Sequence, residues 1–363
     1  MQLATDPTAE ARQLDPDGDS GTRIESLAPR ALFWRHFKRD RLAIASLVFL
    51  GLLILMAIFA PFIATKLVHH GPNQLFINQT LNEFGLPKGP NHQFWFGADD
   101  NGRDEFVRVM YGARTSLIVA FFATGISLLI GLIIGLVAGF YGGRVDTVLS
   151  RFTDIVMSVP VLLLALGLVA ACGLSPNGCF GGLVKPGLLL VSYVIGLFNW
   201  PYISRLVRGE VIRLRQKEFV EAAHALGSTN LRIMGREILP NVFAPVLVFT
   251  TLVIPNNILF EAALSFLGIG VPATTPSWGK MLADASDKFT VAWWMMVFPG
   301  LFLFATTLAF NLVGDGLRDA LDPRNSRTRI KVRRRERRRR RRLAREQAAA
   351  EGEIGSTPME VSV

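Results

Sequence analysis

Three polar side chains interrupt a long apolar stretch of the chain and are the first candidates for chemistry. Asn256, Asn257 and Glu261 lie within an apolar run at about 242 to 269. An ionisable side chain is costly to bury at such depth in a membrane segment, and it commonly marks the path of a transported solute. The alternative is that the asparagines only join neighbouring helices and that Glu261 lies near the outer mouth of the segment.

A second group of candidates lies in a polar stretch between two apolar runs, EAAHALGSTNLRIMGREILPN at 221 to 241. Apolar residues recur at helical spacing on both sides of Gly227, which predicts two short helices joined by a left-handed glycine. Ala222 and Ala223 leave a smooth, narrow face beside Glu221 that another protein could approach closely. The alternative is an amphipathic helix on the membrane surface, but the stretch lacks a strong apolar face with aromatic anchors.

Cysteine and histidine provide two weaker candidates. Cys172 and Cys179 are the only cysteines. Both are expected near the outer face of the membrane, where they could form a short-loop disulfide or remain two free thiols. His69, His70 and His92 are expected in one outer loop, but no fourth ligand follows at metal spacing. We therefore expect no metal site.

The elements that position these residues are expected to be membrane-spanning helices. The chain has 363 residues, of which 50% are hydrophobic, more than an ordinary soluble chain carries. Six apolar runs are each long enough to cross a bilayer core of roughly 30 Å. In lipid every backbone polar group must be satisfied within its own segment, so the prediction is an all-α integral membrane protein. The six expected spans are approximately 42 to 63, 116 to 140, 155 to 172, 187 to 204, 242 to 269 and 291 to 314.

Two local features refine these spans. Gly131, Gly135 and Gly139 recur at every fourth position of the second span, which favours close contact with another helix. Pro160 is expected to kink the third span.

The positions of lysine and arginine predict the orientation of the chain. Such residues cluster just before the first span and again between the fourth and fifth spans, within residues 205 to 241. Because positive charge near span ends marks the cytoplasmic side, both termini are expected inside the cell. The loops at 64 to 115, 173 to 186 and 270 to 290 are then expected outside.

The net charge of +10 is concentrated in one tail. Thirteen arginines lie between Arg324 and Arg345, and the remaining chain has slightly more acidic than basic residues. This local basicity does not indicate a nucleic-acid partner. Like charges repel, so residues 325 to 363 are expected to form a disordered cytoplasmic tail, with contact to anionic membrane lipid as the alternative. Residues 1 to 30 are expected to form a second disordered cytoplasmic tail.

Several motifs in consistent order resemble a transporter family. The pattern E-A-A, three residues, G, ten residues, I-L-P resembles the coupling loop of permease subunits of bacterial ATP-driven importers. Its residues are Glu221, Ala222, Ala223, Gly227, Ile238, Leu239 and Pro240. Three further stretches resemble the dipeptide, oligopeptide and nickel permease family, in particular its C-type subunit. They are FWFGADDNGRDEFVRVMYGARTSL at 94 to 117, SFLGIGVPATTPSWGKML at 265 to 282 and NLVGDGLRDALDPR at 311 to 324. The resemblance covers residues 31 to 324, the expected permease domain.

The resemblance implies an alternating-access pathway in the bacterial plasma membrane. Its implied partners are a second homologous permease chain, two cytoplasmic ATPase subunits and an extracytoplasmic solute-binding protein. The implied solute is a di- or oligopeptide; nickel or another small chelate is the alternative, and a solitary channel or secondary transporter is a third hypothesis. The implied role of the Glu221 segment is to dock in a groove of the ATPase. No G-x-x-x-x-G-K-[ST] phosphate loop occurs in the chain, so ATP and Mg²⁺ are expected on the partner subunits and no enzymatic activity is expected here.

Overall fold

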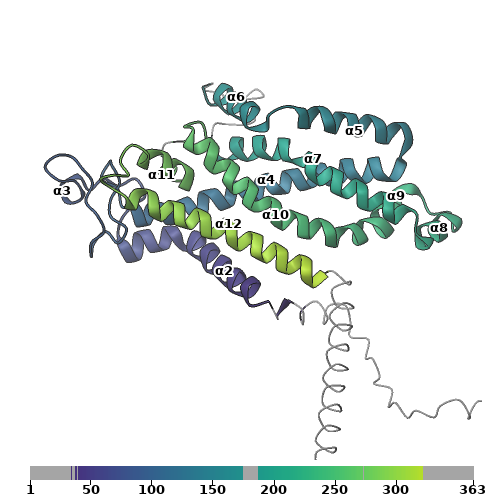
Figure 1. The fold of residues 1–363 in the computed structure, drawn as a ribbon, viewed down its shortest axis with the longest axis horizontal. Helices are drawn as coiled ribbons and strands as arrows, with labels where there is room; N and C mark the ends of the chain where they lie inside the picture. Colours follow the sequence, from purple (N-terminus) through teal and green to yellow (C-terminus); the bar gives the residue numbers. More distant parts are fainter. Residues whose placement is uncertain (1–33, 35–36, 39, 175–186, 273, 322–363) are drawn as a thin grey trace, which may run out of the picture.

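The structure is a computed structural model that describes residues 34, 37–38, 40–174, 187–272 and 274–321. Within these residues the regular secondary structure is helical, and extended pairing is limited to two isolated bridges. The prediction of an all-α protein is therefore confirmed. The helices form an elongated bundle with α3 (Ile77–Thr80) near one end and α8 (Glu218–Ala225) at the other (Figure 1).

Within the described residues, four helical stretches are long and apolar enough to cross a membrane. A fifth is obtained if α5 (Gly143–Ser158) and α6 (Val161–Leu174), which are bent by 77° relative to each other, together form one span. The bend lies at Pro160, so the predicted kink of this segment is confirmed. The four stretches are α2 with its π-helical end η2 (Arg41–Phe62, Ile63–Val68), α4 (Glu105–Tyr141), α9 with η4 and α10 (Asn230–Arg232, Ile233–Ile238, Leu239–Phe266), and α12 (Trp294–Leu321).

The expected fourth span lies in α7 (Leu188–Arg215), which is a long helix. This helix is not among the stretches that qualify as spans by length and composition. Its apolar part contains Asn199 and Pro201, and arginines follow from Arg205 onward, so its mean hydropathy is lower than that of the other long helices. A helix or helix pair is present at each of the six expected spans. By length and hydropathy, however, only four or five of the described stretches qualify as membrane spans.

The helix α4 begins eleven residues before the expected start of the second span, inside the expected outer loop. Asp104 caps it, because its carboxylate accepts hydrogen bonds from the backbone N–H groups of Phe106 at 2.9 Å and Val107 at 3.4 Å. The first turns carry charged residues, including Glu105 and Arg108, which are buried. An apolar run therefore underestimates the length of this helix, since its start is stabilised by a cap and by ion pairs.

Helix α4 makes its closest contact with α7, and it does so through its glycines. A side chain on Gly131, Gly135 or Gly139 would collide with α7; at Gly135 a Cβ atom would lie 2.7 Å from the Ser204 carbonyl oxygen and from the Val207 Cβ. The two backbones therefore approach closely along several turns, as the fourfold spacing predicted. In Figure 1, α5 and α6 lie along one side of this pair, and α2 and α12 lie toward the opposite side.

The segment after Gly227 differs from the prediction of a separate short helix. Here α9 continues through the π-helical turn η4 directly into α10, forming one stretch from Asn230 to Phe266. Pro240 lies at the beginning of α10, where the π-helical turn precedes it. A proline cannot donate the backbone hydrogen bond of a regular helix, and the wider π turn lets the chain continue past it.

Candidate functional site

The polar stretch at 221 to 241 forms a helical corner at one end of the bundle. The helix α8 ends at Ala225, and Gly227 takes a left-handed conformation with φ of 75°. The N–H of Gly227 donates to the carbonyl of His224 at 2.9 Å, and that of Ser228 donates to the carbonyl of Ala223 at 3.1 Å. Gly227 therefore ends the first helix as predicted, and α9 begins three residues later.

Two large apolar side chains stand exposed on this corner. Leu226 and Leu231 are 86% and 78% exposed, and Glu221 and Ala222 on α8 are also exposed. The helical spacing of the apolar residues predicted the two helices but not which of these residues are buried. The segment anchors through Val220, which is buried against residues of η4 and α7. An exposed apolar pair next to a carboxylate is typical of a protein-binding surface.

The corner is tied to the ends of α4 and α7. The guanidinium of Arg215, at the end of α7, donates to the carbonyl of Phe140 at 2.7 Å. The ring of Phe140 stacks on the imidazole of His224 in α8 with centroids 6.3 Å apart. The last turn of α4 is therefore in contact with both α8 and the end of α7. Leu239 and Pro240, also predicted as coupling residues, lie further along, where η4 meets α10.

The three polar residues predicted inside the fifth span are separated by the structure. Asn257 and Glu261 are fully buried, whereas Asn256 is exposed. Asn257 joins three helices: its amide accepts from Asn199 of α7 at 2.6 Å and donates to Thr124 of α4 at 2.8 Å. These contacts match the alternative stated from the sequence, in which the asparagine joins neighbouring helices and does not line a solute path.

Glu261 lies at the junction of α4, α10 and α11 (Trp278–Ala285). Its carboxylate oxygens accept hydrogen bonds from the hydroxyls of Ser116 on α4 at 2.8 Å and Ser265 on α10 at 2.7 Å. Close by, the indole of the buried Trp278 donates to the carbonyl of Val109 at 3.1 Å. Glu261 thus holds an interhelical junction, and its contact with a transported solute stays a prediction.

An ion-pair cluster at the start of α4 was not predicted as a site. Asp99 pairs with Arg103 at 2.6 Å and with Arg108 at 3.3 Å, and His70 contacts Asp104 at 2.5 Å. Arg103 is largely buried and the other four are buried. The sequence signal was the dense run of charges in GADDNGRDEFVRV, which was interpreted as part of a family motif and not as a cluster of ion pairs. The cluster fixes the segment between η2 and α4 onto the start of α4.

No group of three or more potential metal ligands lies together among the residues described by the structure. His70 is engaged with Asp104, as noted above. Cys172 is buried near the end of α6. Cys179 lies outside the described residues, so the disulfide between the two stays a prediction.

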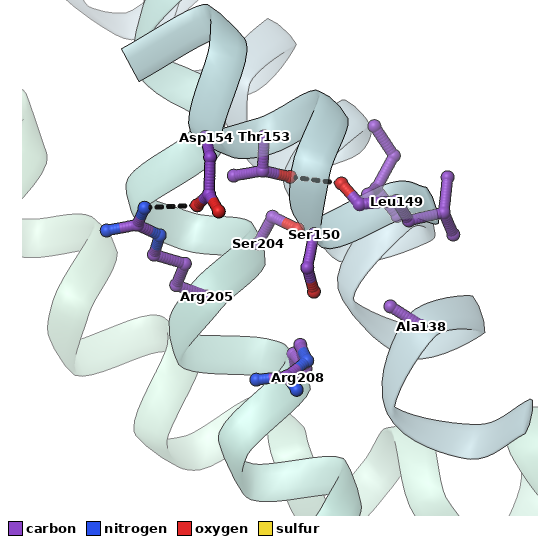
Figure 2. Close-up of a pocket in the computed structure, with 9 residues that line it drawn as sticks. Ala138, Leu149, Ser150, Thr153, Asp154, Ser204, Arg205 and Arg208 are labelled. Carbon is purple, nitrogen blue, oxygen red and sulfur yellow. Dashed lines mark hydrogen bonds and ion pairs between the residues drawn. The ribbon is translucent and has the colours of Figure 1, made fainter. Parts of the chain in front are cut away.

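A polar cavity of about 320 Å³ lies between α4, α5 and α7 (Figure 2). Across it, Asp154 of α5 pairs with Arg205 of α7 at 2.7 Å. One turn of α7 further on, Arg208 donates two hydrogen bonds to Asp146 of α5, at 2.5 and 2.7 Å. In the sequence, these arginines indicated only the orientation of the chain. The cavity is lined by Ile134, Ala138, Leu149, Ser150, Thr153, Asp154, Ser204, Arg205 and Arg208.

Comparison with known proteins identifies the family of the chain. Residues 131–327 match the family described as binding-protein-dependent transport system inner membrane component. Residues 29–84 match the N-terminal TM domain of oligopeptide transport permease C. These matches confirm the resemblance that the sequence motifs indicated.

Curated relatives cover most of the chain. The dipeptide transport system permease protein DppC of Alkalihalophilus pseudofirmus is 41% identical over 82% of this chain and 91% of its own length. The oligopeptide transport system permease protein OppC of Bacillus subtilis is 36% identical over 85% and 96%, respectively. The glutathione transport system permease protein GsiD of Escherichia coli is 41% identical over 80% and 89%. The chain therefore belongs to the family of inner membrane components of binding-protein-dependent transport systems, and it is a multi-pass transport subunit rather than an enzyme.

Proposed function

We propose that this chain is one of two permease subunits of an ATP-driven importer for di- or oligopeptides. The observation that carries the proposal is its similarity, over more than four fifths of its length, to permeases named for dipeptide and oligopeptide transport. A glutathione permease, also a carrier of a peptide by its name, is equally similar. Nickel or another small chelate is less favoured, because none of these relatives is named for such a solute.

The proposed topology has six spans, with both termini and the corner around Gly227 in the cytoplasm. Gly316 near the end of α12 lies directly against Ala43 near the start of α2, so these two ends lie on one side. The far end of α2 packs on the start of α4 through Ala60, Ala64, Val107 and Met110. The other end of α4 meets α8 through Phe140 and His224. These contacts support a common side for α8 and both termini, and the lysine and arginine clusters favour the cytoplasm for that side.

The proposed partner of the corner is an ATPase subunit. The surface around Glu221, Leu226 and Leu231 projects from the end of the bundle, and the contact between His224 and Phe140 offers a path into the spans. Since the chain has no phosphate loop, ATP with Mg²⁺ would bind to the partner ATPases. An extracytoplasmic binding protein would deliver the peptide to the opposite end of the pathway.

Glu221→Lys tests the docking role. The substitution places the wrong charge on the proposed contact face, and like-charge contact at an interface can cost several kcal/mol. We expect normal accumulation in the membrane, loss of the co-purified ATPase, and loss of peptide uptake in vesicles. Glu83→Lys is the matched control, because Glu83 is an exposed glutamate in the outer segment.

The outcomes separate the alternatives. Wild-type co-purification and uptake with Glu221→Lys would reject the docking role. Uptake of Ni²⁺ or a chelate, but not of di- or oligopeptides, by the wild-type complex with its binding protein would reject the peptide assignment. Uptake by the chain alone, without ATPase or ATP, would favour a solitary channel or secondary transporter.

A further inference from the structure

The helix α5 exposes apolar side chains and places some of its polar side chains toward α7. Val148 and Ile155 are exposed, while Ser150, Thr153 and Asp154 line the cavity of Figure 2 between α5 and α7. The α5–α7 contact is therefore a mixed seam, in which Phe152 stacks on Trp200 of α7 with centroids 5.8 Å apart and polar groups surround an open space. The polar groups of this seam can be hydrated when the contact opens.

Two ion pairs hold this seam together. Asp146 accepts two hydrogen bonds from Arg208, in the bidentate geometry that makes arginine pairs strong and directional. Asp154 accepts one from Arg205, and both partners of this pair are about half exposed. Pairs that are partly exposed contribute modestly to stability, which suits a contact that must form and break.

Both ends of α5 have the geometry of a hinge. At its start, Gly142 and Gly143 have φ values of 66° and 51°, which break the helical path after α4. At its end, Val159 and Pro160 separate it from α6 at the bend of 77°. A proline cannot continue the hydrogen-bond ladder, so the two helices can change their angle here without breaking a regular helix.

The first of these hinges directly follows the residue that contacts α8. Phe140 stacks on His224 of α8 and accepts a hydrogen bond from Arg215, and Gly142 follows two residues later. The guanidinium of Arg215 also packs close to Gly142. Displacement of α8 would therefore act on this hinge through Phe140, as well as on α7 and η4 through Val220.

From these observations we propose that Asp146 and Asp154 are positioning residues for transport: through Arg208 and Arg205 they hold α5 on α7 in one state of the cycle, and α5 swings away between its two hinges in the other. This proposal rests on the proposed importer function, since it assumes that an ATPase moves α8. It assigns the ion pairs a role in the transport cycle beyond folding. The moving element would carry displacement from α8 to α6.

Charge exchange tests the positioning role. Asp146→Arg and Arg208→Asp should each lower peptide uptake by the reconstituted full complex about fivefold or more, the size of a typical coupling between conformational states. ATP hydrolysis should persist in both, so the ratio of peptide imported to ATP consumed falls. The double variant Asp146→Arg with Arg208→Asp restores the pair in reverse and should regain most of that ratio. Glu210→Arg is the matched control, because Glu210 pairs with Arg213 within α7 and not with α5.

A reversible cross-link tests whether α5 must leave α7. Ser150 of α5 and Ser204 of α7 line the same cavity (Figure 2). With both replaced by cysteine, a short cleavable thiol cross-linker should join them, block uptake, and allow uptake again after reduction. Ser150→Cys and Ser204→Cys alone, treated identically, control for reaction at the native cysteines, and mass spectrometry of the linked peptides verifies the bridge.

Each result either supports the proposal or overturns it. Full uptake with the bridge in place would show that α5 does not alternate between the two positions. A bridge that forms in none of the nucleotide states would show the same. Equal loss of uptake in the single and double charge variants would show that the pairs do not position α5. If the wild-type complex does not import peptide and does not contain an ATPase, the proposed function fails. If it imports peptide and contains an ATPase, the outcomes above test only the hinge motion of α5.

Discussion

Asn256 and Asn257 are neighbours in the chain but lie in different environments. Asn257 joins α7 and α4 through two side-chain hydrogen bonds, while Asn256 is exposed and donates only to the carbonyl of Leu252 in its own helix. The sequence could identify both as unusual in an apolar run. It could not separate them, because the packing of α10 against other helices decides which side of the helix is buried.

The glycines of α4 provide the sharpest prediction at this scale. In Gly135→Ala the added methyl group would lie 2.7 Å from backbone and side-chain atoms of α7. We expect a loss of stability of about 1 to 3 kcal/mol, as for an overpacked core. A lower thermal unfolding midpoint in detergent would be the direct measurement.

Gly125→Ala is the matched control, since no atom lies within 4 Å of an added Cβ at Gly125. Alanine is favoured over glycine in a helix by about 1 kcal/mol, so this variant should be neutral or slightly more stable. Equal unfolding midpoints for the two variants would contradict the close approach of α4 and α7.

At the scale of elements, local sequence signals predicted interruptions better than helix starts. Gly227 ends α8 and Pro160 separates α5 from α6, as expected from residues that disfavour continued helix. The start of α4 and the continuity of α9 with α10 were missed. At the start of α4 charged residues are held by ion pairs, and in η4 the apolar residues Ile233, Met234 and Ile238 are buried in the core. An apolar run does not reveal either contact.

The corner formed by Gly227 yields a prediction for α8 and α9. Valine at this left-handed position should lower the local conformational stability by on the order of 1 to 2 kcal/mol. It should also change the angle between α8 and α9. We expect Gly227→Val to insert and accumulate normally. It should retain less ATPase, or hydrolyse ATP without importing peptide, as measured by co-purification and by uptake in vesicles.

Gly235→Ala is the control for that variant, because Gly235 lies in η4 without a left-handed conformation and with open space around it. It should behave as the wild type does. Unchanged coupling in Gly227→Val would mean that the angle of the corner has no role in transport.

At the scale of the whole molecule, the bundle has two different ends. One end carries α8 and α9, and the other carries α3 (Figure 1). The segment between η2 and α4, which contains α3, is fixed to the start of α4 by ion pairs that include Asp99 with Arg108. In the proposed function, the first end receives force from the ATPase and the second receives the solute. The unpaired apolar surface on α5 and other helices is consistent with a subunit that works in lipid and beside other chains.

A prediction at this scale concerns the isolated subunit. Because no phosphate loop occurs in the chain, the purified protein should show no ATP turnover above a buffer control, whereas the complex with its ATPase subunits should hydrolyse ATP. The measurement is phosphate release from protein purified in parallel with an unrelated membrane protein. Turnover that remains with the isolated subunit through successive purification steps would contradict it.

The sequence by itself determined the helical membrane class, the family, the end of α8 at Gly227, the bend at Pro160, and the face of α4 on which Gly131, Gly135 and Gly139 contact another helix. These features depend on local chemistry: apolar length, a glycine that can turn left-handed, a proline without an N–H, and small side chains at fixed spacing. Only the tertiary structure decided that Leu226 and Leu231 are exposed and that Glu261 bonds to serines of two helices. Only the tertiary structure brings Asp146 to Arg208 and Asp154 to Arg205. The partners lie some fifty to sixty residues apart in the chain, so their contact depends on how the helices pack and not on the periodicity of any one helix.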